Sequence, residues 1–263
     1  MKRMVFFLAI GFVLVLAVMP LKTVQANDHK GVLHFGIVPQ QAASRLAEIW
    51  LPFIEKLSQE TGLNIQFTTM KDIPTFEQCL AKGAYDLAYM NPYHYTVFHE
   101  KSGYNAIAHQ ANKKLKGLVV VRKDSPFKTL SDLTGQKIAF PSPAAFGASV
   151  LPRAEMQNQG IDFVPIYVKS HDSVYKSVAA GLFKAGGGVL RTFNSIDKEL
   201  REQLRIIYET NVYTPHAFAI HPHIPQQMGL KIRDAMIKIS VENPALIRSE
   251  ERRVGKECRS RWS

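Results

Sequence analysis

Phe140-Pro141-Ser142-Pro143-Ala144-Ala145-Phe146-Gly147-Ala148-Ser149-Val150-Leu151-Pro152 carries the strongest local signal for the fold, and we call it the decisive stretch. The short apolar run before it, residues 137–140, predicts a buried strand that stops at the cluster of Pro, Ser and Gly. Pro152 then predicts the start of a helix, because proline is tolerated only in a helix's first turn. We expect this helix to begin near residues 147–149, with Ser149 as its capping side chain.

A helix that begins at a tight loop of small residues can bind an anion. Its first amide N–H groups have no partner within the helix, and the positive end of the helix dipole lies there. An ordinary strand–turn–helix connection without a ligand is the alternative that this stretch leaves open.

The N-terminus predicts a cleavable export signal. Lys2 and Arg3 precede an apolar run over residues 4–19, and Val24-Gln25-Ala26 supplies the small residues of a cleavage site. The apolar run is short for a membrane span. We therefore expect residues 1–26 to be removed and a soluble protein to be exported, with no cysteine for a lipid anchor.

The formal net charge of the 263 residues, +11, is concentrated at the two ends of the chain. Residues 27–251 carry a net charge of only +4, and residues 252–263 carry the same charge in twelve positions. Nucleic-acid binding requires basic residues gathered on one face. We therefore predict no nucleic-acid partner.

Alternating apolar runs predict an α/β protein with parallel-type sheets covered by helices on both faces. Ligands of such sheets bind beyond the carboxyl ends of the strands. The expected strands are 31–39, 64–68, 85–90, 105–110, 117–122, 137–140, 163–168, 185–190, 204–208 and 216–220. The expected helices are 42–61, 74–82, 93–101, 129–133, 149–159, 173–182, 195–203 and 225–241.

Four segments in register carry a family resemblance. Phe35-Gly36-Ile37-Val38-Pro39, Tyr85 to Tyr93, the turn at 141–149, and Ser170-His171-Asp172-Ser173-Val174 leading to the triple glycine at 186–188 follow one another in order. Together they resemble the phosphate/phosphite/phosphonate substrate-binding proteins of ABC transporters over about residues 31–247.

The resemblance implies an α/β fold of the two-lobed periplasmic-binding type (type II). Each lobe is then a mostly parallel sheet flanked by helices, and two crossover strands, near 118–121 and 214–219, join the lobes. Lobe 1 is expected to comprise residues 31–119 plus 216–248, and lobe 2 residues 120–215. Residues 249–263 lose all periodicity and resemble translated sequencing-adaptor sequence, so we interpret them as an irregular, non-native tail, with a genuine basic end as the alternative.

The resemblance also implies where the ligand oxygens are held. The corresponding positions are Tyr93 and His171, together with the turn residues Ser142, Ala145, Phe146, Gly147, Ala148 and Ser149. One departure matters, because Ala144-Ala145-Phe146 replaces the hydroxyl-rich run of the phosphonate binders. Fewer charge-assisted bonds predict a weaker or differently shaped site, in which Phe146 could support a more apolar ligand.

Three further residues are ligand candidates by position. Gln40 follows the first strand, His94 follows Tyr93, and Arg191 follows the glycine turn, where it could balance an anion or lie in solvent. Tyr93 could instead pack at a helix start, and His171 could share in capping its helix. His216, His221 and His223 lack the spacing of metal ligands, and we find no catalytic constellation.

The expected function is that of a periplasmic receptor of an ABC importer. It would be a monomer without enzymatic activity, cofactor or metal, and it would close two lobes over a small oxyanion and deliver it to a membrane permease. A ligand sensor for a signalling partner, and a receptor for a different small organic ligand, are the alternatives.

Overall fold

The computed structural model describes residues 31–111 and 113–247. The predicted signal, residues 1–26, and the predicted tail, residues 249–263, lie outside the described residues. Within the described ranges, no helix is both long and apolar enough to cross a membrane.

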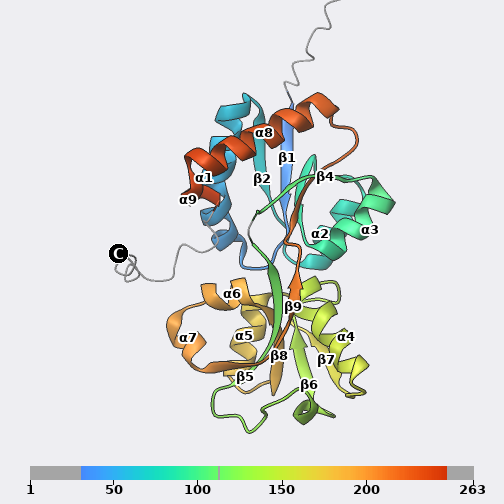
Figure 1. The fold of residues 1–263 in the computed structure, drawn as a ribbon, viewed down its shortest axis with the longest axis vertical. Helices are drawn as coiled ribbons and strands as arrows, with labels where there is room; N and C mark the ends of the chain where they lie inside the picture. Colours follow the sequence, from blue (N-terminus) through green and yellow to red (C-terminus); the bar gives the residue numbers. More distant parts are fainter. Residues whose placement is uncertain (1–30, 112, 248–263) are drawn as a thin grey trace, which may run out of the picture.

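The first lobe is built on a five-stranded sheet with the order β2-β1-β3-β10-β4. Helices surround this sheet in the upper half of Figure 1. The strands are β1 (Val32–Ile37), β2 (Asn64–Thr68), β3 (Leu87–Met90), β4 (Asn105–His109) and β10 (Ala217–Ile220). The helices are α1 (Ala43–Thr61), α2 (Ile73–Ala81), α3 (Pro92–Ser102), α8 (Gln226–Glu242) and α9 (Pro244–Ile247).

The second lobe, in the lower half of Figure 1, has a five-stranded sheet with the order β7-β6-β8-β5-β9. Its strands are β5 (Leu115–Arg122), β6 (Lys137–Phe140), β7 (Val164–Tyr167), β8 (Ala185–Val189) and β9 (Leu204–Tyr213). Its helices are η1 (Ser131–Leu133), η2 (Phe146–Val150), α4 (Leu151–Asn158), α5 (His171–Ala179), α6 (Leu190–Ser195) and α7 (Lys198–Glu202).

Each sheet is mostly parallel, as predicted, and contains one reversed strand among those described. β10 runs antiparallel to both of its neighbours in the first sheet, and β5 does so in the second. Both are the first strand after the chain crosses from the other lobe, which explains their reversed direction. The crossings lie between β4 and β5 and between β9 and β10 (Figure 1). All of β5 pairs in the second sheet, so the change of lobe expected at 119/120 falls inside that strand.

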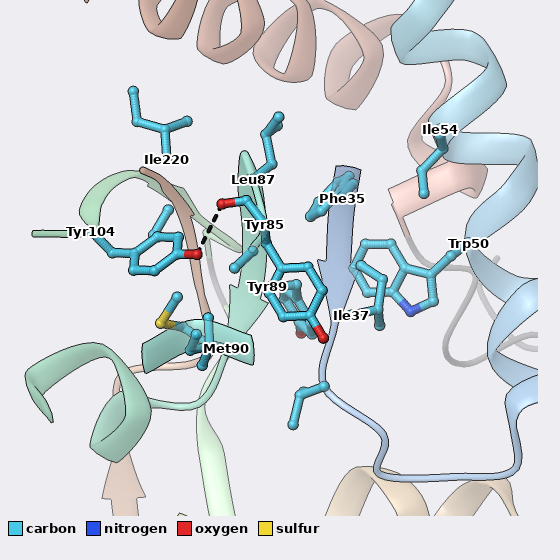
Figure 2. Close-up of a cluster of buried hydrophobic side chains, with 14 of the residues drawn as sticks. Phe35, Ile37, Trp50, Ile54, Tyr85, Leu87, Tyr89, Met90, Tyr104 and Ile220 are labelled. Atoms are coloured by element: carbon cyan, nitrogen blue, oxygen red, sulfur yellow. Dashed lines mark hydrogen bonds between the residues drawn. The ribbon is translucent and has the colours of Figure 1, made fainter. Parts of the chain in front are cut away.

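Aromatic side chains pack around the end of β3 in the first lobe. Tyr89 of β3 lies 4.6 Å from Trp50 of α1 and 5.0 Å from Phe218 of β10, measured between ring centroids. The hydroxyl of Tyr104 donates to the carbonyl of Tyr85 at 2.8 Å, marked by the dashed line in Figure 2. Burying such side chains contributes about 1.5–3 kcal/mol each. The end of β3 is therefore a rigid support for the loop that follows it.

The helix after the decisive stretch begins earlier than predicted. η2 is a π-helix whose N-cap is Ala145, and Ser149 makes no capping bond. The N–H groups of Ser149 and Val150 both donate to the Ala145 carbonyl, at 2.7 and 3.2 Å. Pro152 lies in the first turn of α4, as predicted. In a regular α-helix a proline ring clashes with the carbonyl four residues before it. The wider π turn before Pro152 avoids this clash, which explains why the helix begins earlier than predicted.

Glycines let this helix start lie directly on the second sheet. A Cβ atom on Gly187 of β8 would stand 2.0 Å from the carbonyl oxygen of Ala148, and one on Gly117 of β5 would stand 2.1 Å from that of Gly147. Real Cβ atoms do not approach this closely. The strands β5 and β8 thus hold the start of η2 at the cleft edge of the second lobe.

Candidate functional site

A small cavity lies between the two lobes. Loops and helix starts from both lobes line it, including the N-terminal ends of α2, α3, η2 and α5. Its volume, measured for the centre of a water-sized sphere, is about 10 Å³, which is close to what one water molecule requires. The lining residues are Val38, Gln40, Ile73, Asn91, Leu115, Ala145, Phe146, Gly147, Ala148, His171, Val189 and His216.

The decisive stretch forms part of the wall of this cavity. Residues 145–148 line it, and the first helical hydrogen bonds of η2 start at the N–H of Ser149. The amides of residues 146–148 therefore precede the helix's own hydrogen bonding, as expected for a helix N-terminus. Ser142 and Ser149 are buried beside them, and their hydroxyl oxygens have no hydrogen-bond partner among the described residues. Neither serine lines the cavity.

His171 reaches the cavity from the first turn of α5. Ser170 caps this helix by accepting a hydrogen bond from the N–H of Ser173, so the helix starts two residues before the expected position 173. The Nδ1 atom of His171 lies 3.1 Å from the Thr192 hydroxyl, which in turn lies 2.8 Å from the hydroxyl of Tyr175. Nε2 is buried and has no partner among the described residues. Burial, and next the charge of Arg191, lower the pKa of His171 to about 3, so the ring is neutral.

His216 lines the same cavity from the crossing between β9 and β10. Its ring stacks on Tyr89 with centroids 5.0 Å apart and an interplanar angle of 20°. Neither ring nitrogen has a partner among the described residues, although the side chain is only 1% exposed. From the sequence, His216 was considered only as a possible metal ligand. The sequence of a crossover segment does not show which of its side chains point into the interior.

Arg191 lies beside the cavity and joins the lobes. From α6 it donates to the Tyr89 hydroxyl at 2.9 Å and to the side-chain carbonyl of Gln40. Gln40 is buried and lines the cavity. The sequence predicted a helix over 195–203, whereas the structure has α6 directly after β8 and α7 after that. Arg191 therefore lies on a helix that directly follows β8, and the glycines at 186–188 before it belong to that strand and not to a turn.

The structure places Tyr93 and His94 away from the cavity lining. Tyr93 is 42% exposed, and His94 is buried against Phe76 with its Nε2 3.0 Å from a Glu77 carboxylate oxygen. The reason is the start of α3. Asn91 caps it by accepting from the N–H of His94, and within this first turn Tyr93 is exposed whereas His94 is buried. Asn91 itself lines the cavity. It was not predicted from the sequence, because the resemblance indicated the tyrosine that follows Asn91-Pro92.

Hydrogen bonds between the lobes surround the cavity. Asn91 donates from its side chain to the carbonyl of Ala144 at 3.1 Å, and the N–H of His171 donates to the carbonyl of Gln40 at 3.2 Å. At the N-terminal end of α1, Gln41 and Arg45 both donate to Ser195 of α6. The two lobes are thus in a closed arrangement.

The chemistry of the cavity suits a small anion. Amides at helix starts and the nearby guanidinium of Arg191 make its electrostatic potential positive. The cavity residues provide amide donors, two neutral imidazoles and apolar walls, and the lining contains no carboxylate. Such a site can hold an oxyanion through hydrogen bonds in a water-excluding environment.

Comparison with known proteins agrees with this geometry. A relative named "Phosphate-import protein PhnD", from Mycolicibacterium smegmatis, is 23% identical, and the alignment covers 74% of this chain and 68% of the relative. PhnD1 from Prochlorococcus marinus, solved with methylphosphonate, has a TM-score of 0.75 at 15% identity, covering 83% of this chain and 88% of that one. A binding component of a phosphonate ABC transporter from Pseudomonas aeruginosa has a TM-score of 0.69 at 17% identity, covering 77% and 72%.

The family model for the periplasmic substrate-binding protein of phosphonate ABC transporters matches residues 35–257. This match includes the whole cavity and extends into the segment predicted to be an irregular tail. The chain therefore belongs to the family of periplasmic phosphonate-binding proteins of ABC transporters.

Proposed function

We propose that this protein binds a small phosphorus oxyanion in the cavity between its lobes and delivers it to a membrane permease. It does so in the periplasm and performs no catalysis. The observation that carries this proposal is that residues 146–148, whose amides precede the hydrogen bonding of η2, line one cavity with His171, whose buried Nε2 has no partner among the described residues. Buried polar atoms without partners are costly, so a ligand that satisfies them is bound at a gain.

The named ligands of relatives support this class. The Mycolicibacterium relative is named for phosphate import, and the Prochlorococcus structure holds methylphosphonate. Both ligands are tetrahedral anions whose oxygens accept hydrogen bonds, which matches a lining rich in donors and without carboxylates.

The size of the cavity supports a hinged mechanism. The enclosed space suits about one water molecule, so the lobes must move apart to admit a phosphonate and then close around it. The two crossings between the lobes are where this rotation takes place, because they are short segments between rigid sheets. Ligand contacts to both lobes then favour the closed form.

Titration calorimetry with phosphate, phosphite and methylphosphonate tests the proposal. We expect heat of binding from at least one of them, and binding at least about 10-fold weaker in His171→Ala, because a buried hydrogen bond to a charged ligand contributes roughly 1.5–3 kcal/mol. His109→Ala, at an exposed position of β4, is the matched control and should bind as the wild type does. A folded wild-type protein that gives no heat with any of the three would refute the proposal.

A further inference from the structure

His216 presents a hydrogen-bond acceptor that the protein leaves unsatisfied. A neutral imidazole has one N–H donor and one acceptor nitrogen. Both ring nitrogens of His216 are buried and without a partner among the described residues. Whichever tautomer is present, one of these nitrogens is therefore a buried donor and the other a buried acceptor. A ligand that only accepts hydrogen bonds can satisfy the donor but leaves the acceptor without a partner.

The surroundings of His216 keep its ring neutral. The ionisable groups that act on it are Arg191, His94 and His171, all of which are bases, and the cavity lining has no carboxylate. Burial and these neighbours lower the pKa of His216 well below its usual value. Protonating the ring would place a second cation near Arg191 in a dry site, so the acceptor is retained at neutral pH.

His171 can supply a donor beside this acceptor. The Tyr175 hydroxyl can donate to the Thr192 hydroxyl, 2.8 Å away, and the Thr192 hydroxyl can donate to the Nδ1 of His171, 3.1 Å away. The proton of the neutral ring is then on Nε2. This Nε2–H has no partner among the described residues, so it can donate to a ligand oxygen.

We propose that the cavity selects a phosphorus oxyanion that keeps a hydroxyl on phosphorus and carries no ammonium group, with His216 as the residue that determines this selectivity. The inference rests on the proposed function, because it specifies the ligand of the same cavity. The P–OH group donates to the imidazole, and the remaining oxygens accept from the amides of residues 146–148.

Sulfate and aminoalkylphosphonates do not complement the groups that line the cavity. Sulfate has lost both protons near neutral pH, so it has no hydroxyl to donate and leaves the buried acceptor unsatisfied. An aminoalkylphosphonate brings an ammonium group, and the cavity lining has no carboxylate to pair with it. Burying an unpaired charge costs several kcal/mol.

Calorimetry near pH 7 with methylphosphonate, sulfate and 2-aminoethylphosphonate tests this selectivity. A site that hydrogen-bonds a hydroxyl discriminates strongly against an analogue without one, so sulfate should bind about 100-fold weaker than methylphosphonate, or more. We expect a difference of at least about 100-fold for 2-aminoethylphosphonate also.

His216→Phe separates the hydrogen bond from the packing, since a phenyl ring can still stack on Tyr89. We expect methylphosphonate to bind about 10-fold weaker in this variant, and sulfate to be affected less, so that the ratio of the two affinities falls. His216→Gln restores both an acceptor and a donor and should keep the preference, which also guards against misfolding of His216→Phe. His109→Gln, on exposed β4, is the control and should leave the ratio unchanged.

The outcomes of this experiment distinguish the two proposals. If methylphosphonate binds but sulfate or 2-aminoethylphosphonate binds equally well, or if His216→Phe is folded and leaves the ratio unchanged, the selectivity is refuted and the proposed function stands. If phosphate, phosphite and methylphosphonate all fail to bind the wild type, the proposed function fails, and the selectivity fails with it.

Discussion

At the scale of single residues, the cavity and the segments beside it contain polar atoms that cost stability. Ser142, Ser149, His171 and His216 all contain buried side-chain atoms without a partner among the described residues. Each such atom costs about 1–3 kcal/mol when nothing satisfies it. A fold tolerates this cost where the atoms serve binding. The sequence shows only in part which polar atoms are buried, because burial of a side chain depends on residues far away in the chain.

Neutral His171 makes stability depend on pH. The pKa of its imidazole is about 3 in the folded protein, against 6.5 for an ordinary histidine, so the unfolded chain takes up the proton first as the pH falls. The free energy of unfolding should therefore be largest above pH 6.5 and should fall as the pH is lowered from there toward 3. The contribution of His171 to this slope approaches about 1.4 kcal/mol per pH unit.

Urea unfolding at a series of pH values measures this slope. His171→Gln cannot take up the proton, so its stability should fall less steeply between pH 6.5 and pH 3 than that of the wild type. His109→Gln should retain the wild-type slope, because His109 is exposed on β4. Equal slopes in the wild type and in His171→Gln would contradict the assignment of a buried neutral ring.

At the scale of elements, the close approach of η2 to β5 and β8 positions the amides of the site. Gly187→Ala places a methyl group where the carbonyl of Ala148 now lies, 2.0 Å from the new atom. The helix start must move off the sheet, and we expect a loss of about 1–3 kcal/mol in the free energy of unfolding together with weaker ligand binding. Gly31→Ala is the control, because a Cβ there meets nothing within 4 Å.

Chemical denaturation and calorimetry on the same two variants check this prediction. A Gly187→Ala protein as stable as Gly31→Ala, and with wild-type affinity, would show that the packing of η2 does not position the site.

Most elements of this fold could be predicted from the sequence, because strong local signals mark them. Gly62 ends α1 in a left-handed conformation, Ser170 caps α5, and Pro74 begins α2, all as their residue types indicate. The start of η2 and the division into α6 and α7 could not be predicted. The first depends on a π turn that packs on glycines of β5 and β8, and the second places Arg191 of α6 in a hydrogen bond to Gln40 of the other lobe, a contact that the local sequence does not show.

The candidate site was predicted unevenly for the same reason. Position at the carboxyl edge of a strand correctly indicated that residues 145–148, His171 and Gln40 lie together around one cavity. It also indicated Tyr93 and His94, which α3 turns elsewhere. Whether any of these residues contacts a ligand stays a prediction.

At the scale of the whole molecule, hydrogen bonds at the N-terminal end of α1 stabilise the closed arrangement. Arg45 of α1 donates to the carbonyl of Ser195, and Gln41 donates to its hydroxyl at 3.1 Å. Arg45→Ala removes a charged donor from this contact. A hydrogen bond to a charged group contributes about 1.5–3 kcal/mol, so we expect binding of methylphosphonate to weaken by about 10-fold as the open form gains population.

Small-angle X-ray scattering checks the cause of this loss. Without ligand, Arg45→Ala should have a larger radius of gyration than the wild type, and saturating methylphosphonate should reduce the difference. Arg233→Ala is the control, because Arg233 pairs with Asp234 on the exposed face of α8. An Arg45→Ala protein with wild-type affinity and dimensions would mean that these bonds do not influence closure.

A crystal structure of the protein with methylphosphonate is the sharpest test of the proposed site. We expect the phosphonate to lie between the lobes, with oxygens about 3 Å from amide nitrogens of residues 146–148 and from the Nε2 of His171. A phosphonate bound elsewhere, or one between the lobes with those amides turned away from it, would refute this site.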